Sequence, residues 1–166
     1  MTPNFLVLGL STLIPLFIGF IWYHPKVFGN VWMKAADMTE DKIKGANMAV
    51  IFGLTLVLGF FLAMSIYFMV IHQAHIFSAV MGDPALEDPN SALSLMLKDF
   101  MDLYGNNYRS FKHGALHGAI GGVMIALPVL AVNALFERKG ATYIGINAGY
   151  WITVMTLMGG VICAYG

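Results

Sequence analysis

Four long apolar stretches constrain the fold of this chain more than any other feature of its sequence. None of them contains Asp, Glu, Lys or Arg, and they cover residues 4–23, 46–71, 114–136 and 142–165. About 20 helical residues are enough to cross the roughly 30 Å hydrocarbon layer of a bilayer. We therefore expect an all-α membrane protein with four transmembrane helices, forming a single integral membrane domain over residues 1–166. Pro15 and Pro128 predict kinks in the first and third helices.

The composition of the chain also indicates a membrane protein. It is 58% hydrophobic and 11% charged, with a mean hydropathy of +0.73, whereas soluble domains carry about 25% charged residues. The net charge of zero and the lack of a basic block argue against nucleic acid as a partner and leave membrane lipid as the expected surrounding. The single cysteine, Cys163, excludes an internal disulfide and is expected to be inert.

Aromatic residues at the end of the first stretch are expected to anchor it at the headgroup level of the membrane. Trp22 and Tyr23 stand there, and Trp32 follows within residues 25–36, whose apolar spacing predicts a short helix lying on the surface. The N-terminus has no basic segment, and Trp22 and Tyr23 occupy the place of the small residues of a cleavage site. We therefore expect the first stretch to remain in the mature protein.

The polar segments predict where further helices begin and end. Thr39, followed by two acidic residues, predicts an N-cap from which one helix should run continuously into the second apolar stretch. Residues 72–113 form a long excursion whose second half predicts an amphipathic helix, capped by Asn90 or Ser91 and closed by Gly105. We expect this helix to lie in the membrane interface or to cap the bundle.

Basic residues predict the orientation of the four crossings, which place both termini on one side. Because basic residues bias a loop toward the cytoplasm, both termini and the excursion should face outward from a bacterial inner membrane. The connections after the first and third stretches hold six basic residues, and the excursion holds three: Lys26, Lys34, Lys42, Lys44, Arg138 and Lys139 against Lys98, Arg109 and Lys112.

Two aromatic motifs give the chain a family resemblance. The segment WYHPKVFGNVW, which begins at Trp22, and the segment NAGYW, which begins at Asn147, resemble those of a bacterial membrane family known only as domain of unknown function 1761. The resemblance covers both ends of the chain and implies the four-crossing architecture, but no activity, substrate or cofactor. The excursion is longer than the usual middle loop of that family, so the resemblance implies nothing for a site built there.

Four histidines form the most suggestive set of candidate ligands. His72 and His75 are three residues apart at the end of the second stretch, and His113 and His117 are four apart at the start of the third. Both spacings place side chains on one helix face, and imidazole is the commonest metal ligand. The favoured interpretation is that they are ordinary interfacial histidines, each bonded to backbone or water. The first alternative is a transition-metal site, in which a carboxylate supplies an oxygen ligand or orients an imidazole, and the second is haem ligation or a proton-relay role. The candidate carboxylates are Glu87, Asp99 and Asp102.

Glycines at four-residue spacing predict close helix packing in the third and fourth stretches. This packing joins helices of one chain, or alternatively docks a second copy or another membrane protein. The glycines concerned are Gly114, Gly118, Gly122, Gly145 and Gly149.

The favoured functional hypothesis is a non-enzymatic component that acts through helix packing, as a homo-oligomer or as a small subunit of a larger membrane complex. The alternative is a histidine-based metal or haem site at the outward end of the second and third helices, in a redox or transport role. A carrier or channel is a third hypothesis, but polar residues within the stretches are few: Asn133, Asn147, His117 and scattered hydroxyls.

Overall fold

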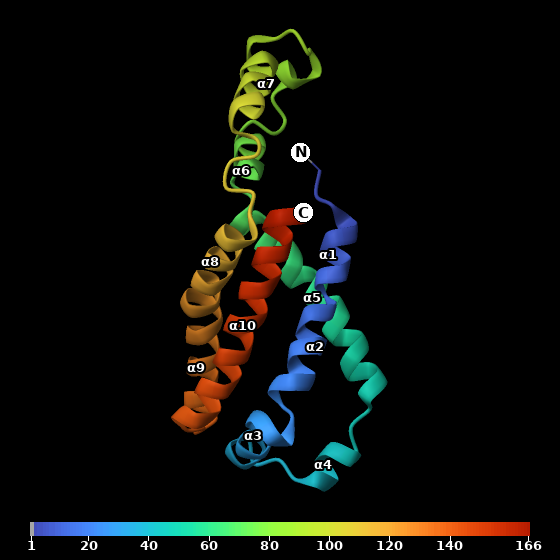
Figure 1. Ribbon diagram of the computed structural model, residues 1–166, viewed down its shortest axis with the longest axis vertical. Coiled ribbons are helices and arrows are strands. Elements are labelled where there is room, and N and C mark those ends of the chain that lie inside the picture. The colour runs from blue at the N-terminus through green and yellow to red at the C-terminus, as the bar shows by residue number, and fades with distance from the viewer. Residues whose placement is uncertain (1) are drawn as a thin grey trace.

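The fold is a bundle of four membrane-spanning helical segments with short helices at both of its ends (Figure 1). The computed structural model describes residues 2–166, and within this range the chain forms helices and no strand. The predicted fold class is confirmed, because four segments are long and apolar enough to cross a membrane. These segments are Phe5–Trp22, Met48–Val70, Phe111–Phe136 and Ala141–Tyr165.

The first span consists of two helices, α1 (Phe5–Ser11) and α2 (Leu13–Trp22). The helix is interrupted at Thr12, three residues before Pro15. A proline removes one backbone hydrogen-bond donor, which weakens the turn before it. The hydroxyls of Ser11 and Thr12 donate to backbone carbonyls one turn back, at 2.7 Å each. The predicted interruption near Pro15 is therefore present and its polar groups are satisfied.

The connection to the second span is helical, as predicted, but it is more divided than the sequence indicates. A short π-helix, η1 (Pro25–Gly29), leads into α3 (Asn30–Ala35), and Thr39 caps α4 (Glu40–Lys44). The expectation of one continuous helix from Thr39 is wrong. The chain leaves the helix after Lys44, and the side chain of Asn47 accepts a hydrogen bond from Val50 N to cap a new helix, α5 (Met48–Val70).

The excursion projects from the end of the bundle at which both termini lie (Figure 1). Ile71 departs from helical backbone angles and separates α5 from α6 (His72–Ala79). A 3₁₀ turn, η2 (Pro84–Glu87), follows and leads to α7 (Ala92–Tyr104), which Ser91 caps through Ser94 N, as one of the two predicted alternatives. Gly105 ends α7, as predicted. In Figure 1, α7 lies beyond the bundle, next to α6.

The third span begins earlier than predicted, because the side chain of Ser110 accepts a hydrogen bond from His113 N and starts α8 (Phe111–Gly121). A π-helical turn, η3 (Gly122–Ala126), joins α8 to α9 (Leu127–Phe136). Pro128 has no N–H to donate, and the irregular turn just before it marks the predicted kink. The fourth span, α10 (Ala141–Tyr165), is one continuous helix and contributes more residues to the buried core than any other described helix.

Glycines let α8 and α10 approach until their backbones touch. A side chain on Gly114 would collide with the carbonyl oxygen of Gly159, and one on Gly118 with that of Met155. At Gly122, a Cβ would lie 2.7 Å from the Cα of Ile152. The three predicted packing glycines of the third span are thus occupied by α10 of the same chain. They contribute to packing within one molecule.

The two predicted packing glycines on α10 differ from each other. A Cβ on Gly149 would lie 3.1 Å from the indole of Trp22, so this glycine makes room for an aromatic side chain of the first connection. A Cβ on Gly145 would have nothing within 4 Å. Replacement of Gly145 is therefore a control for replacement of the glycines that do contact another helix.

Replacing Gly118 by alanine should destabilise the bundle, whereas the same change at Gly145 should not. The added methyl at Gly118 forces α8 away from the Met155 backbone, which cannot move aside, at a cost of about 1–3 kcal/mol. At Gly145 the alanine gains helix propensity in open space. Thermal unfolding of both variants in the same detergent measures the difference. Equal melting temperatures for the two variants would contradict the proposed backbone contact.

Candidate metal centre

Three histidines from two helices, α6 and α8, meet at the end of the bundle that carries the termini. His113 lies in the first turn of α8 and His117 one turn later, so both point to the same side of that helix. His72 is the first residue of α6, directly after the bend at Ile71. One ligand atom from each of the three residues lies within 4.8 Å of those of the other two. The structure therefore brings together three of the four predicted ligands.

The rings are close enough to interact directly. Nε2 of His72 lies 2.9 Å from Nε2 of His113, a hydrogen bond in which one nitrogen donates and the other accepts. The ring centre of His117 is 4.9 Å from that of His72 and 4.5 Å from that of His113. Two nitrogens on a tetrahedral zinc ion are about 3.3 Å apart, given Zn–N bonds of about 2.0–2.1 Å. A metal would need His72 and His113 to separate by about 0.4 Å, and the ring that donates through Nε2 would need to carry its proton on Nδ1 instead.

His75 is not part of this group. Its Nε2 is 2.7 Å from the carbonyl oxygen of Phe68, so it closes the turn between α5 and α6 instead. The predicted carboxylates are also elsewhere: Asp102 pairs with Lys98 at 2.8 Å on the exposed side of α7, and neither Glu87 nor Asp99 is among the clustered ligand atoms of residues 2–166. The clustered donors are thus three imidazoles.

Burial and the neighbouring imidazoles keep His72 uncharged. Partial burial lowers the pKa of His72 below its usual 6.5, and His117, His113 and His75 lower it further. Its imidazole is therefore neutral at pH 7, which is the form that coordinates metal ions. The ring of Tyr108 packs against His113 at a centre distance of 5.0 Å and covers the cluster from the loop after α7.

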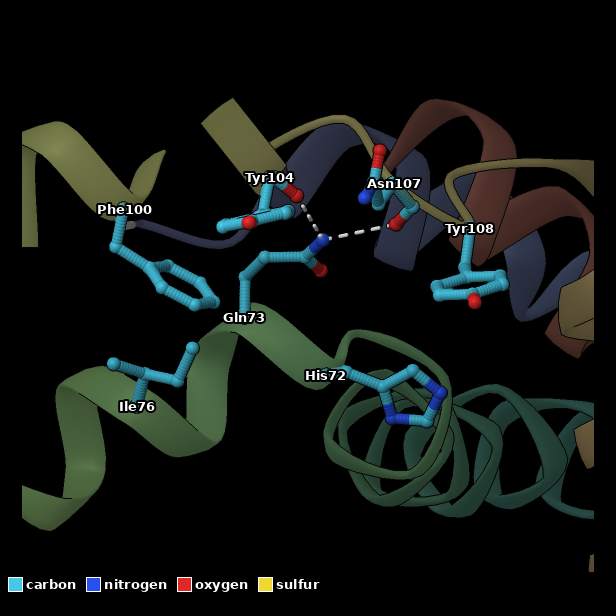
Figure 2. A pocket seen from close by; sticks show the side chains of 7 residues that line it. All are labelled: His72, Gln73, Ile76, Phe100, Tyr104, Asn107 and Tyr108. Atoms are coloured by element: carbon cyan, nitrogen blue, oxygen red, sulfur yellow. Dashed lines mark hydrogen bonds between the residues drawn. The ribbon is translucent and has the colours of Figure 1, made fainter. Parts of the chain in front are cut away.

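A cavity of about 280 Å³ opens beside His72, between α6 and the C-terminal end of α7. Figure 2 shows Gln73 at its wall, with the amide nitrogen donating to the carbonyl oxygens of Tyr104 and Asn107, at 3.1 and 2.9 Å. The carbonyl of Tyr104 ends α7, and that of Asn107 lies just after it. No further helical turn follows to donate N–H groups to these carbonyls, so Gln73 supplies the donor. Gln73 thus fixes α7 to α6. The sequence analysis missed this residue, because a lone glutamine in a helix carries no signal of its partners.

The aromatic residues predicted as interface anchors meet α10 at the opposite end of the bundle. Oδ1 of Asn147 accepts hydrogen bonds from the Tyr23 hydroxyl at 3.0 Å and from the Trp32 indole at 3.2 Å. The indole of Trp22 donates to the carbonyl oxygen of Ile146 at 3.0 Å. The two motifs, far apart in sequence, therefore form one contact that joins the first connection to the fourth span.

Replacing Asn147 by leucine should destabilise this contact by about 2 kcal/mol, because two half-buried donors lose their acceptor. The volume changes little, so the loss reports hydrogen bonding rather than packing. Chemical or thermal unfolding in detergent measures it. Asn133→Leu is the matched control, since Asn133 is exposed on α9 and its side chain makes no hydrogen bond with residues 2–166. An Asn147→Leu variant as stable as the control would contradict the role given to Asn147.

Comparison with known proteins identifies a family for the chain but no similar curated protein or solved structure. The family described as "Protein of unknown function (DUF1761)" matches residues 6–163, nearly the whole chain. No curated protein and no solved structure matches the chain.

Proposed function

The chain belongs to the DUF1761 family, and we propose that it is a multi-pass membrane protein that binds one transition-metal ion through His72, His113 and His117. The observation that carries the proposal is the meeting of these three imidazoles, with ligand atoms within 4.8 Å of one another, from two separate helices, α6 and α8. An ionisable residue within a membrane segment is costly to place and is a functional candidate by default. His113 and His117 both lie in the third span.

The donor set favours a particular kind of ion. Imidazole suits zinc, copper, iron and nickel, whereas magnesium and calcium require oxygen ligands. Three nitrogen atoms that converge on one point favour a single ion over haem, which takes its axial ligands on opposite faces of a wide ring. Three protein ligands also leave at least one coordination position open, as in catalytic zinc sites. An open position suits a redox or transport role better than a purely structural one.

The site is expected to face outward from the cell membrane. The six basic residues predicted at the opposite end of the bundle favour the cytoplasm there. The three basic residues of the excursion give a weaker bias on the histidine side. In a bacterial inner membrane this orientation opens the metal centre to the outer compartment, where an ion or its ligand would be exchanged.

Purified protein should bind one transition-metal ion per chain, and replacing His113 or His117 by alanine should abolish binding. Removing one of three ligands leaves two imidazoles, which hold a divalent ion too weakly to survive purification. Titration with Co²⁺ gives the readout, because Co²⁺ in a low-symmetry nitrogen site absorbs visible light. Elemental analysis of the loaded protein gives the stoichiometry.

His75→Ala is the matched control for this experiment. It removes a histidine three residues from His72, and with it only the contact with Phe68. It should leave Co²⁺ stoichiometry unchanged. Absence of saturable Co²⁺, Zn²⁺ and Cu²⁺ binding by the unmodified protein, or equal binding by the His113→Ala variant, would rule out the metal centre.

An assembly role is a second candidate, supported by the open side of α5. The first half of α5 diverges from the other spans (Figure 1), and an apolar cavity of about 370 Å³ lies between α1 and α5, lined in part by Gly9 and Phe61. Apolar side chains from a helix of a second copy could occupy this space in place of lipid. The particle size in mild detergent tests this role, and a strictly monomeric particle recovered with no partner would remove it.

A further inference from the structure

The cavity between α6 and α7 is lined mainly by apolar and aromatic side chains, together with Gln73, Asn107 and His72. Gln73 is only 5% exposed, and its amide nitrogen is held by two carbonyl oxygens. Because carbonyls accept hydrogen bonds and cannot donate, this contact fixes which end of the amide is nitrogen. Figure 2 shows the amide oxygen turned away from those carbonyls, on the side of His72 and Tyr108.

The amide oxygen of Gln73 lacks a partner within the part of the chain that the structure describes. No residue between 2 and 166 donates a hydrogen bond to it. No fully buried polar side-chain atom in the same range is without a partner, so this oxygen is accessible to solvent. An accessible acceptor at a cavity wall can take a hydrogen bond from a donor group on a molecule that enters the cavity, in place of water.

The remaining walls define the shape and charge of that occupant. The rings of Phe100 and Tyr104 pack against each other at 5.0 Å, and Ile76 and Tyr108 add further apolar surface. The imidazole of His72 and Asn107 complete the lining. No charged side chain of residues 2–166 lines the cavity. Aromatic walls favour a flat ring, and a volume of about 280 Å³ admits one or two fused rings.

We infer that this cavity binds a small, neutral phenolic molecule whose hydroxyl donates to Oε1 of Gln73, beside the three-histidine metal centre. The cavity lies just beyond the ends of the second and third spans, so an amphipathic ring can enter from water or from the bilayer surface. The inference rests on the proposed function in one respect: His72 belongs to both sites and places the phenol next to the ion.

The test uses the full chain in detergent, with 2-naphthol as the probe and 2-methoxynaphthalene as its matched analogue. Both are flat, neutral and fluorescent, but only 2-naphthol can donate a hydrogen bond. We expect 2-naphthol to raise the melting temperature of the metal-free protein and to bind roughly five- to tenfold more tightly than the methyl ether, the effect of one hydrogen bond. Ile76→Trp, which fills the cavity without altering Gln73, should abolish the stabilisation by 2-naphthol.

Proximity to the metal is measured separately. Protein loaded with Co²⁺ should quench the fluorescence of bound 2-naphthol, whereas protein loaded with Zn²⁺ should not, because Co²⁺ is paramagnetic and Zn²⁺ is not. Ile76→Trp in the same detergent corrects for probe that partitions into micelles.

The outcomes separate the two proposals. Equal binding of 2-naphthol and its methyl ether, or stabilisation that survives in Ile76→Trp, would overturn the phenol site while leaving Co²⁺ binding intact. Failure to bind any metal, with selective 2-naphthol binding retained by the metal-free protein, would overturn the metal centre and support the phenol site. Bound 2-naphthol that Co²⁺ does not quench would overturn the placement of the phenol beside the ion.

Discussion

The contact between the backbones of α8 and α10 is the constraint on which the rest of the structure depends. A Cβ on Gly114 would collide with the carbonyl oxygen of Gly159, and a Cβ on Gly159 with that of Gly114. Gly118 lies equally close to the backbone of Met155, so a larger residue at any of these glycines would force the two helices apart. In a membrane, apolar side chains gain little by leaving lipid, and close van der Waals contact between helices becomes a principal source of association. His113 and His117 lie directly before Gly114 and Gly118 in α8. The contact between the helices therefore also fixes the position of two of the three imidazoles.

The two ends of the bundle are joined by different chemistry. At one end, aromatic side chains from α2 and α3 donate to the side chain or backbone of α10, which fixes the first connection by hydrogen bonds. Lys139 adds an ion pair with Asp37 at 2.6 Å there, and it holds the pKa of the Asp37 carboxyl below its usual range. At the other end, α7 is held mainly by Gln73, with the histidine cluster and an open cavity beneath it. The closely packed end suits anchoring of the helices. The open end would suit exchange of a ligand at the proposed sites.

The sequence was sufficient for the fold and for part of the site. Uncharged apolar stretches define the four spans, and residue spacing places His113 and His117 on one face of α8. The spacing of His72 and His75 was less informative, because Ile71 breaks the helix and directs His72 toward α8 while His75 turns back to Phe68. That bend depends on tertiary contacts, as does the choice of Gly159 as the partner of Gly114. The role of Gln73 could not be predicted, since its partners are backbone carbonyls of a distant loop.

The ends of the polypeptide lie beside each other at the same end of the bundle (Figure 1). The side chain of Asn4 donates to the carbonyl oxygen of Tyr165 at 3.3 Å, and Arg109 donates to the carbonyl oxygens of Cys163 and Gly166. A short peptide bridging residues 4 and 165 would therefore close the chain into a ring without stretching any helix. New ends opened in the turn at residues 137–140 would then give a circularly permuted protein with the same helix neighbours and the reverse sidedness of its termini.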